Sequence, residues 1–129
     1  MKPHRTPLAS TKILNGAHEL AVHDLRQRDD SFTLHYTITP PLPDAADDTP
    51  VLLAVEAMDD IGNEYLDWGG AYGAADEGTH TNGSISAQPA LAPEAREIHV
   101  RITFLHRAEE YPCHLTLHTA DVRTTDART

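Results

Sequence analysis

The chain has 129 residues, carries a formal net charge of −10 at pH 7, and is 40% hydrophobic but only 5% aromatic. Its length fits a single domain with a mainly aliphatic core, and its charge excludes nucleic acids and anionic membranes from the expected partners. The single cysteine, Cys113, excludes an internal disulfide.

The first ten residues contain no apolar segment of the kind found in signal peptides, and no apolar run approaches the length of a membrane-spanning helix. We therefore expect a cytoplasmic protein without membrane contact. Residues 1–10 are polar, hold two prolines and are predicted to form a flexible arm. Residues 11–14 predict a short edge strand that ends at Asn15 and Gly16.

A clear alternation of apolar and polar residues marks the next strand, residues 31–39. Its apolar positions, all of one parity, are Phe32, Leu34, Tyr36 and Ile38. A period of two with threonines between predicts a half-buried strand. We expect residues 18–26 to pair with it through a turn at residues 26–30.

The central segment, residues 51–73, predicts a β-hairpin around which the other strands are arranged. Residues 51–58 form an apolar run too short for a helix, and the glycine and asparagine at positions 62 and 63 tolerate the positive φ of a tight turn. The return strand, residues 64–68, is predicted to end at a pair of glycines.

Three more strands are predicted, at residues 80–87, 97–105 and 113–118. Residues 106–112 predict a polar turn between the last two strands, because they are charged and include a proline. Residues 90–95 predict at most one helical turn, and residues 121–129 a flexible tail.

Seven or eight short strands, separated by turns rich in Pro, Gly and Asp, predict an all-β protein. The expected fold is an antiparallel two-sheet sandwich, immunoglobulin-like in outline, formed by residues 11–120 between flexible ends at 1–10 and 121–129. A small closed barrel is the alternative. Only the architecture is predicted, because the Cys-Trp-Cys spacing of true immunoglobulin domains is missing.

Nine histidines in 129 residues are unusual, and four share the outward parity of their strands: His35, His99, His114 and His118. Pairing Val100 with Leu117 in a terminal hairpin would put His99 opposite His118, close enough for both imidazoles to bind one zinc ion. No motif supplies a third and a fourth ligand. Solvent-facing histidines are the competing interpretation.

Carboxylates gather in loops that an antiparallel fold would bring to one end. They are Asp44, Asp47, Asp48, Asp76, Glu77, Glu109 and Glu110, with Asp29, Asp30, Asp59 and Asp60 expected at the other end. Clustered carboxylates are the ligands that calcium prefers. Because no Asp-x-Asp-x-Asp-Gly run is present, a solvated surface and a docking surface for a basic partner are the alternatives.

The aromatic residues Tyr65, Trp68 and Tyr72 lie close together beside several glycines. Trp68 shares the parity of Leu66 and is most simply a core residue. The alternative places the three rings on the surface as a flat platform for a sugar or a peptide.

We expect neither catalytic activity nor a bound cofactor. Cys113 has the apolar parity of its strand, which indicates a core residue instead of a nucleophile. No serine lies in a Gly-x-Ser-x-Gly turn, and the glycine-rich residues 69–73 are not followed by the Lys-Ser/Thr pair of a phosphate-binding loop.

Four short motifs carry a resemblance to a group of proteins: DDIGNEY at 59–65, WGGAYG at 68–73, DEGTHTNG at 76–83 and PALAPEAREIHV at 89–100. Over about residues 58–102 the chain resembles small uncharacterised actinobacterial proteins with an immunoglobulin-like sandwich. These motifs are structural, so the resemblance implies a fold and a bacterial source, and it carries over no activity and no functional residue.

These features together predict a non-enzymatic interaction or accessory module that binds a protein partner or a second copy of itself. Its working surface would be a sheet face rich in His and Thr, or the acidic loop end. A metal-binding or carbohydrate-binding module is the alternative.

Overall fold

The structure is a computed structural model that describes residues 7–42, 51–74 and 78–124. Its strands are β1 (Ala9–Ile13), β2 (His18–Gln27), β3 (Phe32–Thr39), β4 (Leu52–Asp59), β5 (Glu64–Ala74), β6 (Thr81–Gln88), β7 (Glu97–His106), β8 (Glu109–His118) and β9 (Arg123–Thr124). The one helical segment in these ranges is the single turn η1 (Thr119–Asp121), so no helix described is long and apolar enough to cross a membrane. The prediction of an all-β chain is confirmed, and each predicted strand is present.

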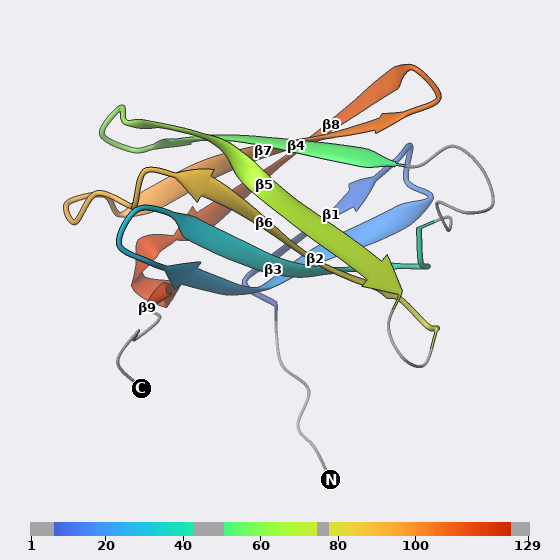
Figure 1. The fold of residues 1–129 in the computed structure, drawn as a ribbon, viewed down its shortest axis with the longest axis horizontal. Helices are drawn as coiled ribbons and strands as arrows, with labels where there is room; N and C mark the ends of the chain where they lie inside the picture. The colour runs from blue at the N-terminus through green and yellow to red at the C-terminus, as the bar shows by residue number, and fades with distance from the viewer. Residues whose placement is uncertain (1–6, 43–50, 75–77, 125–129) are drawn as a thin grey trace, which may run out of the picture.

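Eight strands form one antiparallel sheet in the order β1-β2-β3-β6-β5-β4-β7-β8, and β9 adds a short parallel pair to β2. Because β1 also lies against β8, the sheet nearly closes on itself around one core (Figure 1). The predicted division into two separate immunoglobulin-like sheets is not formed, since hydrogen bonds link each neighbouring pair of strands in this order. The barrel alternative is nearer to the structure.

The core is built, as predicted, from the apolar residues of strands in which apolar and polar residues alternate. It includes Phe32, Leu34, Tyr36 and Ile38 of β3, Val100 and Ile102 of β7, and Leu117 of β8, all buried. Tyr65 of β5 joins them, and its ring meets that of Phe32 edge to face, with centroids 5.4 Å apart. Such a contact adds roughly 0.5–1.5 kcal/mol to the burial of the two rings.

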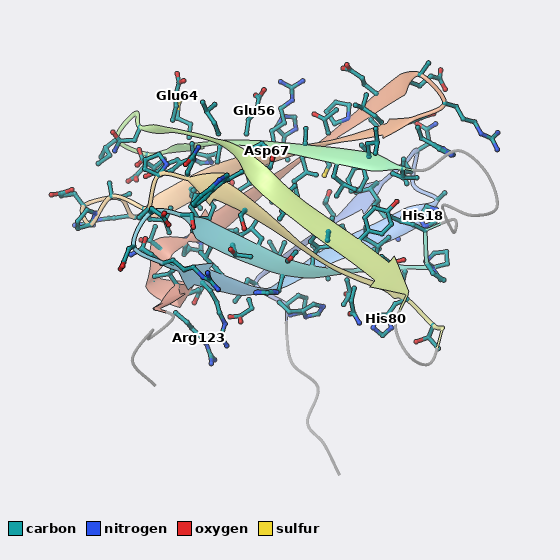
Figure 2. The ribbon with its side chains drawn as sticks, in the orientation of Figure 1. His18, Glu56, Glu64, Asp67, His80 and Arg123 are labelled. Carbon is teal, nitrogen blue, oxygen red and sulfur yellow. The ribbon has the colours of Figure 1, made fainter. Side chains whose placement is uncertain are left out.

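A seam opens in the sheet where β4 and β5 separate after three residue pairs. Beyond this point β4 stays with β7 and β5 stays with β6, and Figure 1 shows β5 running obliquely away from β4. Asp67 lies where the two strands part (Figure 2). Its carboxylate accepts hydrogen bonds from the backbone N–H groups of Val55 at 2.9 Å and Gly69 at 2.6 Å. One side chain therefore satisfies a backbone donor on each of the separating strands.

The turn between β7 and β8 is shorter than predicted. It consists of Arg107 and Ala108, whose φ angles of 54° and 67° fit the two-residue turns that join twisted antiparallel strands. Pro112, which suggested a longer turn, lies inside β8 opposite Thr103. Proline is tolerated there because β8 is the last strand in the order, and among the described strands only β7 forms a ladder with it.

The predicted tail at residues 121–129 begins inside the fold. Arg123 pairs with Arg26 of β2 in a parallel bridge, and the Thr119 hydroxyl donates a 2.7 Å hydrogen bond to the Ala95 carbonyl. Residues 90–95 contain a hydrogen-bonded turn, in which the Ala95 N–H donates to the Ala92 carbonyl, in place of a helical turn.

Candidate functional site

The three aromatic residues proposed as a platform lie in three different environments. Tyr65 is 1% exposed and belongs to the core, whereas Trp68 is 48% exposed. Tyr72 is half-buried, and its hydroxyl donates a 2.7 Å hydrogen bond to the Val51 carbonyl across the seam. The predicted three-ring platform is therefore not formed, and the simpler interpretation of Trp68 as a core residue is also wrong.

Trp68 lies on the outer face of β5 because it shares the parity of the exposed Leu66, and β5 contains a bulge at Trp68. Asp67 pairs with Ala87 and Gly69 pairs with Ser86, which leaves Trp68 as the extra residue between two ladder pairs. Gly69 has a φ of 106°, a conformation that favours glycine, so the glycine is what allows the chain to make this bulge.

The exposed Trp68 ring borders a hollow of about 530 Å³ on the outer face of β2, β3, β6 and β5, which we call the Trp68 hollow. Its lining residues are Arg26, Arg28, Ser31, Thr33, His35, Trp68, Ser84 and Ser86. Cross-strand pairing brings the polar ones together, with Thr33 opposite Ser86 and His35 opposite Ser84. The hydroxyls of Thr33 and Ser86 are hydrogen-bonded at 2.7 Å, so the hollow presents a pre-formed polar surface beside an aromatic ring.

The Trp68 hollow is cationic although the chain is acidic. None of its described lining residues is an Asp or Glu, whereas the whole chain has 20 acidic residues against 10 Lys and Arg. The carboxylate of Asp24 pairs with one of the lining arginines: it lies 2.6 Å from the Arg26 Nε, and it also lies 3.9 Å from the Arg123 Nε. Burial raises the pKa of Asp24, but the hydrogen bond and charge of Arg26 and the charges of Arg123 and His35 together lower it below its ordinary value.

Tyr72 lines a second cleft, of about 420 Å³, in the seam between β4 and β5. Its lining is mostly apolar and includes Val51, Leu53 and Ile85. With few charged groups, this cleft offers less chemistry for orienting a ligand than the Trp68 hollow does.

The register predicted for the last hairpin is wrong by two residues. Val100 pairs with Leu115, so His99 faces Thr116 and does not face His118. The cause is the short turn, after which β8 begins already at Glu109. Each residue of β7 therefore faces a residue of β8 that lies two positions earlier in the chain than predicted. The cross-strand histidine pair on which the zinc site rested is therefore not formed.

Glu97 occupies the position opposite His118. Its carboxylate oxygens lie 3.8 Å from the His99 ring and 3.9 Å from the His118 ring, and all three side chains are at least 42% exposed. Within residues 7–42, 51–74 and 78–124, no group of three or more His, Cys, Asp or Glu side chains is arranged to hold a metal ion.

The acidic loop end proposed for calcium is only partly described. Asp44, Asp47, Asp48, Asp76 and Glu77 lie outside the described residues, and Glu109 and Glu110 begin β8. At the other end, Asp59 and Asp60 bind backbone groups of the protein itself. Asp60 accepts hydrogen bonds from the N–H groups of Arg96 and Glu97, which together hold the pKa of Asp60 below its ordinary value.

The face rich in His and Thr is divided in two. Thr33, His35 and Thr37 lie on β3, whereas His99 and Thr116 lie on β7 and β8, and three strands separate β3 from β7 in the sheet. Cys113 is 7% exposed, as its parity predicted, and burial raises the pKa of its thiol to about 11. A thiol that is neutral at pH 7 is a poor nucleophile.

No family model, curated protein or solved structure matches the chain. The candidate site therefore rests on the geometry of this chain alone. Arg26 and Arg28 were not predicted from the sequence as site residues. The signal that the sequence did offer for this surface was the outward parity of Thr33 and His35, which line the hollow together with Trp68.

Proposed function

We propose that the protein is a non-catalytic binding domain that holds an acidic saccharide in the Trp68 hollow. The observation that carries this proposal is the half-exposed Trp68 ring beside a hollow lined by two arginines, a histidine and four hydroxyl side chains, with no carboxylate among the lining residues that the structure describes. Aromatic rings provide a flat apolar surface, and hydroxyls on a rigid sheet hydrogen-bond to the edges of a sugar.

The charge of the hollow supports a carboxylated sugar over a neutral one. Arg26 is already paired with Asp24, whereas Arg28 forms no ion pair with any other described residue. The planar guanidinium of arginine binds a carboxylate through two parallel hydrogen bonds, so Arg28 is the residue that we expect to hold the acid group.

Isothermal titration with an oligogalacturonate, compared with a neutral oligosaccharide of the same length, tests the proposal. We expect the acidic sugar to bind and the neutral one to bind at least about tenfold more weakly, a difference of about 1.4 kcal/mol. Trp68→Ala and Arg28→Ala should each weaken binding by a similar factor. Leu66→Ala, which removes a comparably exposed apolar side chain two residues away on β5, is the matched control.

Equal binding of the two sugars would contradict the role of Arg28, and no binding of either would contradict the saccharide site itself. A Trp68→Ala variant that binds like the wild type would show that the ring does not take part.

A protein-binding role is the second candidate function. It is favoured by one observation, the exposed large apolar side chains of the described chain, which all belong to the β4–β5 hairpin: Leu52, Met58, Ile61, Leu66 and Trp68. Two of them, Met58 and Leu66, line one shallow hollow, and apolar side chains grouped on a surface commonly mark a protein-binding site.

A further inference from the structure

The outer face of β5, β4, β7 and β8 carries a regular pattern of charged and apolar side chains, which we call the hairpin face. Its residues form two cross-strand rows, Leu66–Glu56–Arg101–His114 and Glu64–Met58–His99–Thr116. All eight are exposed, and the face has a shallow hollow of about 330 Å³ between β5, β4 and β7.

Acidic and basic side chains occupy opposite halves of the hairpin face. The carboxylates of Glu56 and Glu64 lie on β4 and β5, and Figure 2 shows both projecting from the same side of that hairpin. The basic side chains of Arg101, His99 and His114 lie on β7 and β8. The boundary between the halves runs along the strands, between β4 and β7.

A surface divided in this way is complementary to itself. A two-fold axis that runs parallel to the strands between β4 and β7 exchanges the two halves when a second copy is laid on the first. Each Glu56 then faces Arg101 of the second copy, and each Met58 faces His99. No carboxylate faces another carboxylate in either row, and face-to-face sheets with nearly aligned strands are a common packing arrangement.

We propose that the hairpin face is the interface of a two-fold symmetric homodimer. The second copy would cover Met58 and Leu66, which are 46% and 61% exposed in the single chain. Within one chain, Glu56 and Arg101 already lie 3.8 Å apart as an ion pair. The dimer would join this pair to the same pair of the second copy in one network.

Two carboxylates, those of Glu97 and Asp60, lie one row beyond His99, and the axis places them opposite one another. Each is engaged within its own chain. Glu97 is engaged by His99 and His118, and Asp60 accepts hydrogen bonds from the backbone N–H groups of Arg96 and Glu97. Charge complementarity of this kind selects the partner and the orientation of an interface, while the apolar side chains contribute the burial.

This inference deepens the second candidate function and does not depend on the saccharide site, because the Trp68 hollow is formed by β2, β3, β6 and β5. Its test therefore uses a different measurement, the molar mass in solution.

Sedimentation equilibrium of the full chain provides that measurement. We expect a dimer for the wild type and a dimer dissociation constant at least about tenfold weaker for Glu56→Arg and for Arg101→Glu, since each places like charges opposite one another across the axis. The double variant carrying both changes should return to the wild-type constant, because the two charges are then exchanged. Glu19→Arg, an equal charge reversal at an exposed position of β2, is the matched control and should leave the constant unchanged.

Met58→Lys gives a second test that keeps the Glu56–Arg101 pair intact, and it should also dissociate the dimer. A monomeric wild type would overturn the proposal. So would single reversals that keep the wild-type mass, or a double variant that stays as weak as the singles. Oligogalacturonate binding measured on the same variants should not change, which separates failure of the dimer from failure of the saccharide site.

Discussion

The hydroxyl of Tyr65 donates a 2.7 Å hydrogen bond to the Asp59 carboxylate, and the two residues are only 1% and 3% exposed. The same carboxylate accepts hydrogen bonds from the backbone N–H groups of Ile61 and Asn63 and from the Asn63 side-chain amide. The Tyr65 hydroxyl in turn accepts one from the Ala92 N–H at 3.0 Å. A single buried charge therefore closes the β4–β5 turn and, through Tyr65, ties it to the loop before β7.

Removing the Tyr65 hydroxyl should destabilise the fold. Tyr65→Phe keeps the ring and its contact with Phe32, but it takes one donor from Asp59 and leaves the Ala92 N–H without its acceptor. We expect the free energy of unfolding in urea to fall by about 1–3 kcal/mol. Tyr111→Phe removes a hydroxyl that also donates to a carboxylate, Glu109, but at an exposed position. That control should change stability by less than about 0.5 kcal/mol, and equal effects of the two variants would contradict the role of burial.

The Asp59 carboxylate should make the fold sensitive to acid. Burial raises the pKa of Asp59, but the hydrogen bonds from Asn63, Tyr65 and Ile61 together lower it below the ordinary value of 3.8. In the pH range between the folded and unfolded pKa values the unfolded chain binds more protons, so the stability gained from Asp59 is complete above 3.8 and is lost as the pH falls towards the folded pKa.

Urea unfolding at a series of pH values from about 6 down to about 3 measures this loss. Asp59→Asn should be less stable than the wild type near neutral pH and should show a shallower fall towards low pH. Asp29→Asn, at an exposed position in the β2–β3 turn, should keep the wild-type profile. If Asp59→Asn also keeps it, the carboxylate does not supply the acid-sensitive part of the stability.

Tyr36 packs its ring directly over a glycine of the neighbouring strand. Gly83 is the cross-strand partner of Tyr36, and a Cβ atom at Gly83 would overlap the ring. We expect Gly83→Ala to destabilise the protein by about 1–3 kcal/mol, because the ring must move in a close-packed core. Gly73→Ala is the matched control, since nothing lies within 4 Å of its added Cβ. A thermal melt in which the two variants unfold together would contradict this packing.

The strands with strict alternation could be predicted from the sequence, and the reason is physical. In β3 all the apolar side chains have the same parity and therefore lie on one face of the strand. Burial of that face decides which residues enter the core. The same argument located β7 and the buried Cys113 and Leu117 of β8. It could not fix how β7 and β8 align, because parity is unchanged by a shift of two residues.

The Trp68 hollow could not be predicted, because it depends on the pairing of β6 with β3 and with β5. Trp68 and Leu66 were correctly assigned to one face of β5, but the core took the other face. Tyr65 can be buried there because Asp59 accepts a hydrogen bond from its hydroxyl, a partner that alternation does not reveal. The hollow also joins residues far apart in the chain, since Thr33 and Ser86 are 53 positions apart.

The β7–β8 turn was predicted, but its two-residue length was not, because its residues lack the usual composition of such short turns. Two-residue turns with positive φ at both positions favour Asn-Gly, whereas this one is Arg107-Ala108. A residue with a Cβ pays a steric penalty in the left-handed region, so the turn stores strain that the pairing of β7 with β8 overcomes.

Replacing Ala108 with glycine should therefore stabilise the protein. A φ of 67° destabilises alanine at this position by about 1–2 kcal/mol, and glycine removes this strain. The greater conformational freedom of glycine in the unfolded chain offsets about 0.5–1 kcal/mol of the stability gained. We expect Ala108→Gly to raise the free energy of unfolding by about 0.5–1 kcal/mol, measured by urea denaturation with thermal melting alongside. Ala54→Gly, at an exposed position of β4, should lower it by a similar amount, because no positive φ is relieved there. Opposite signs for these two changes are the expected result, and a loss of stability in both would mean that the β7–β8 turn is not strained.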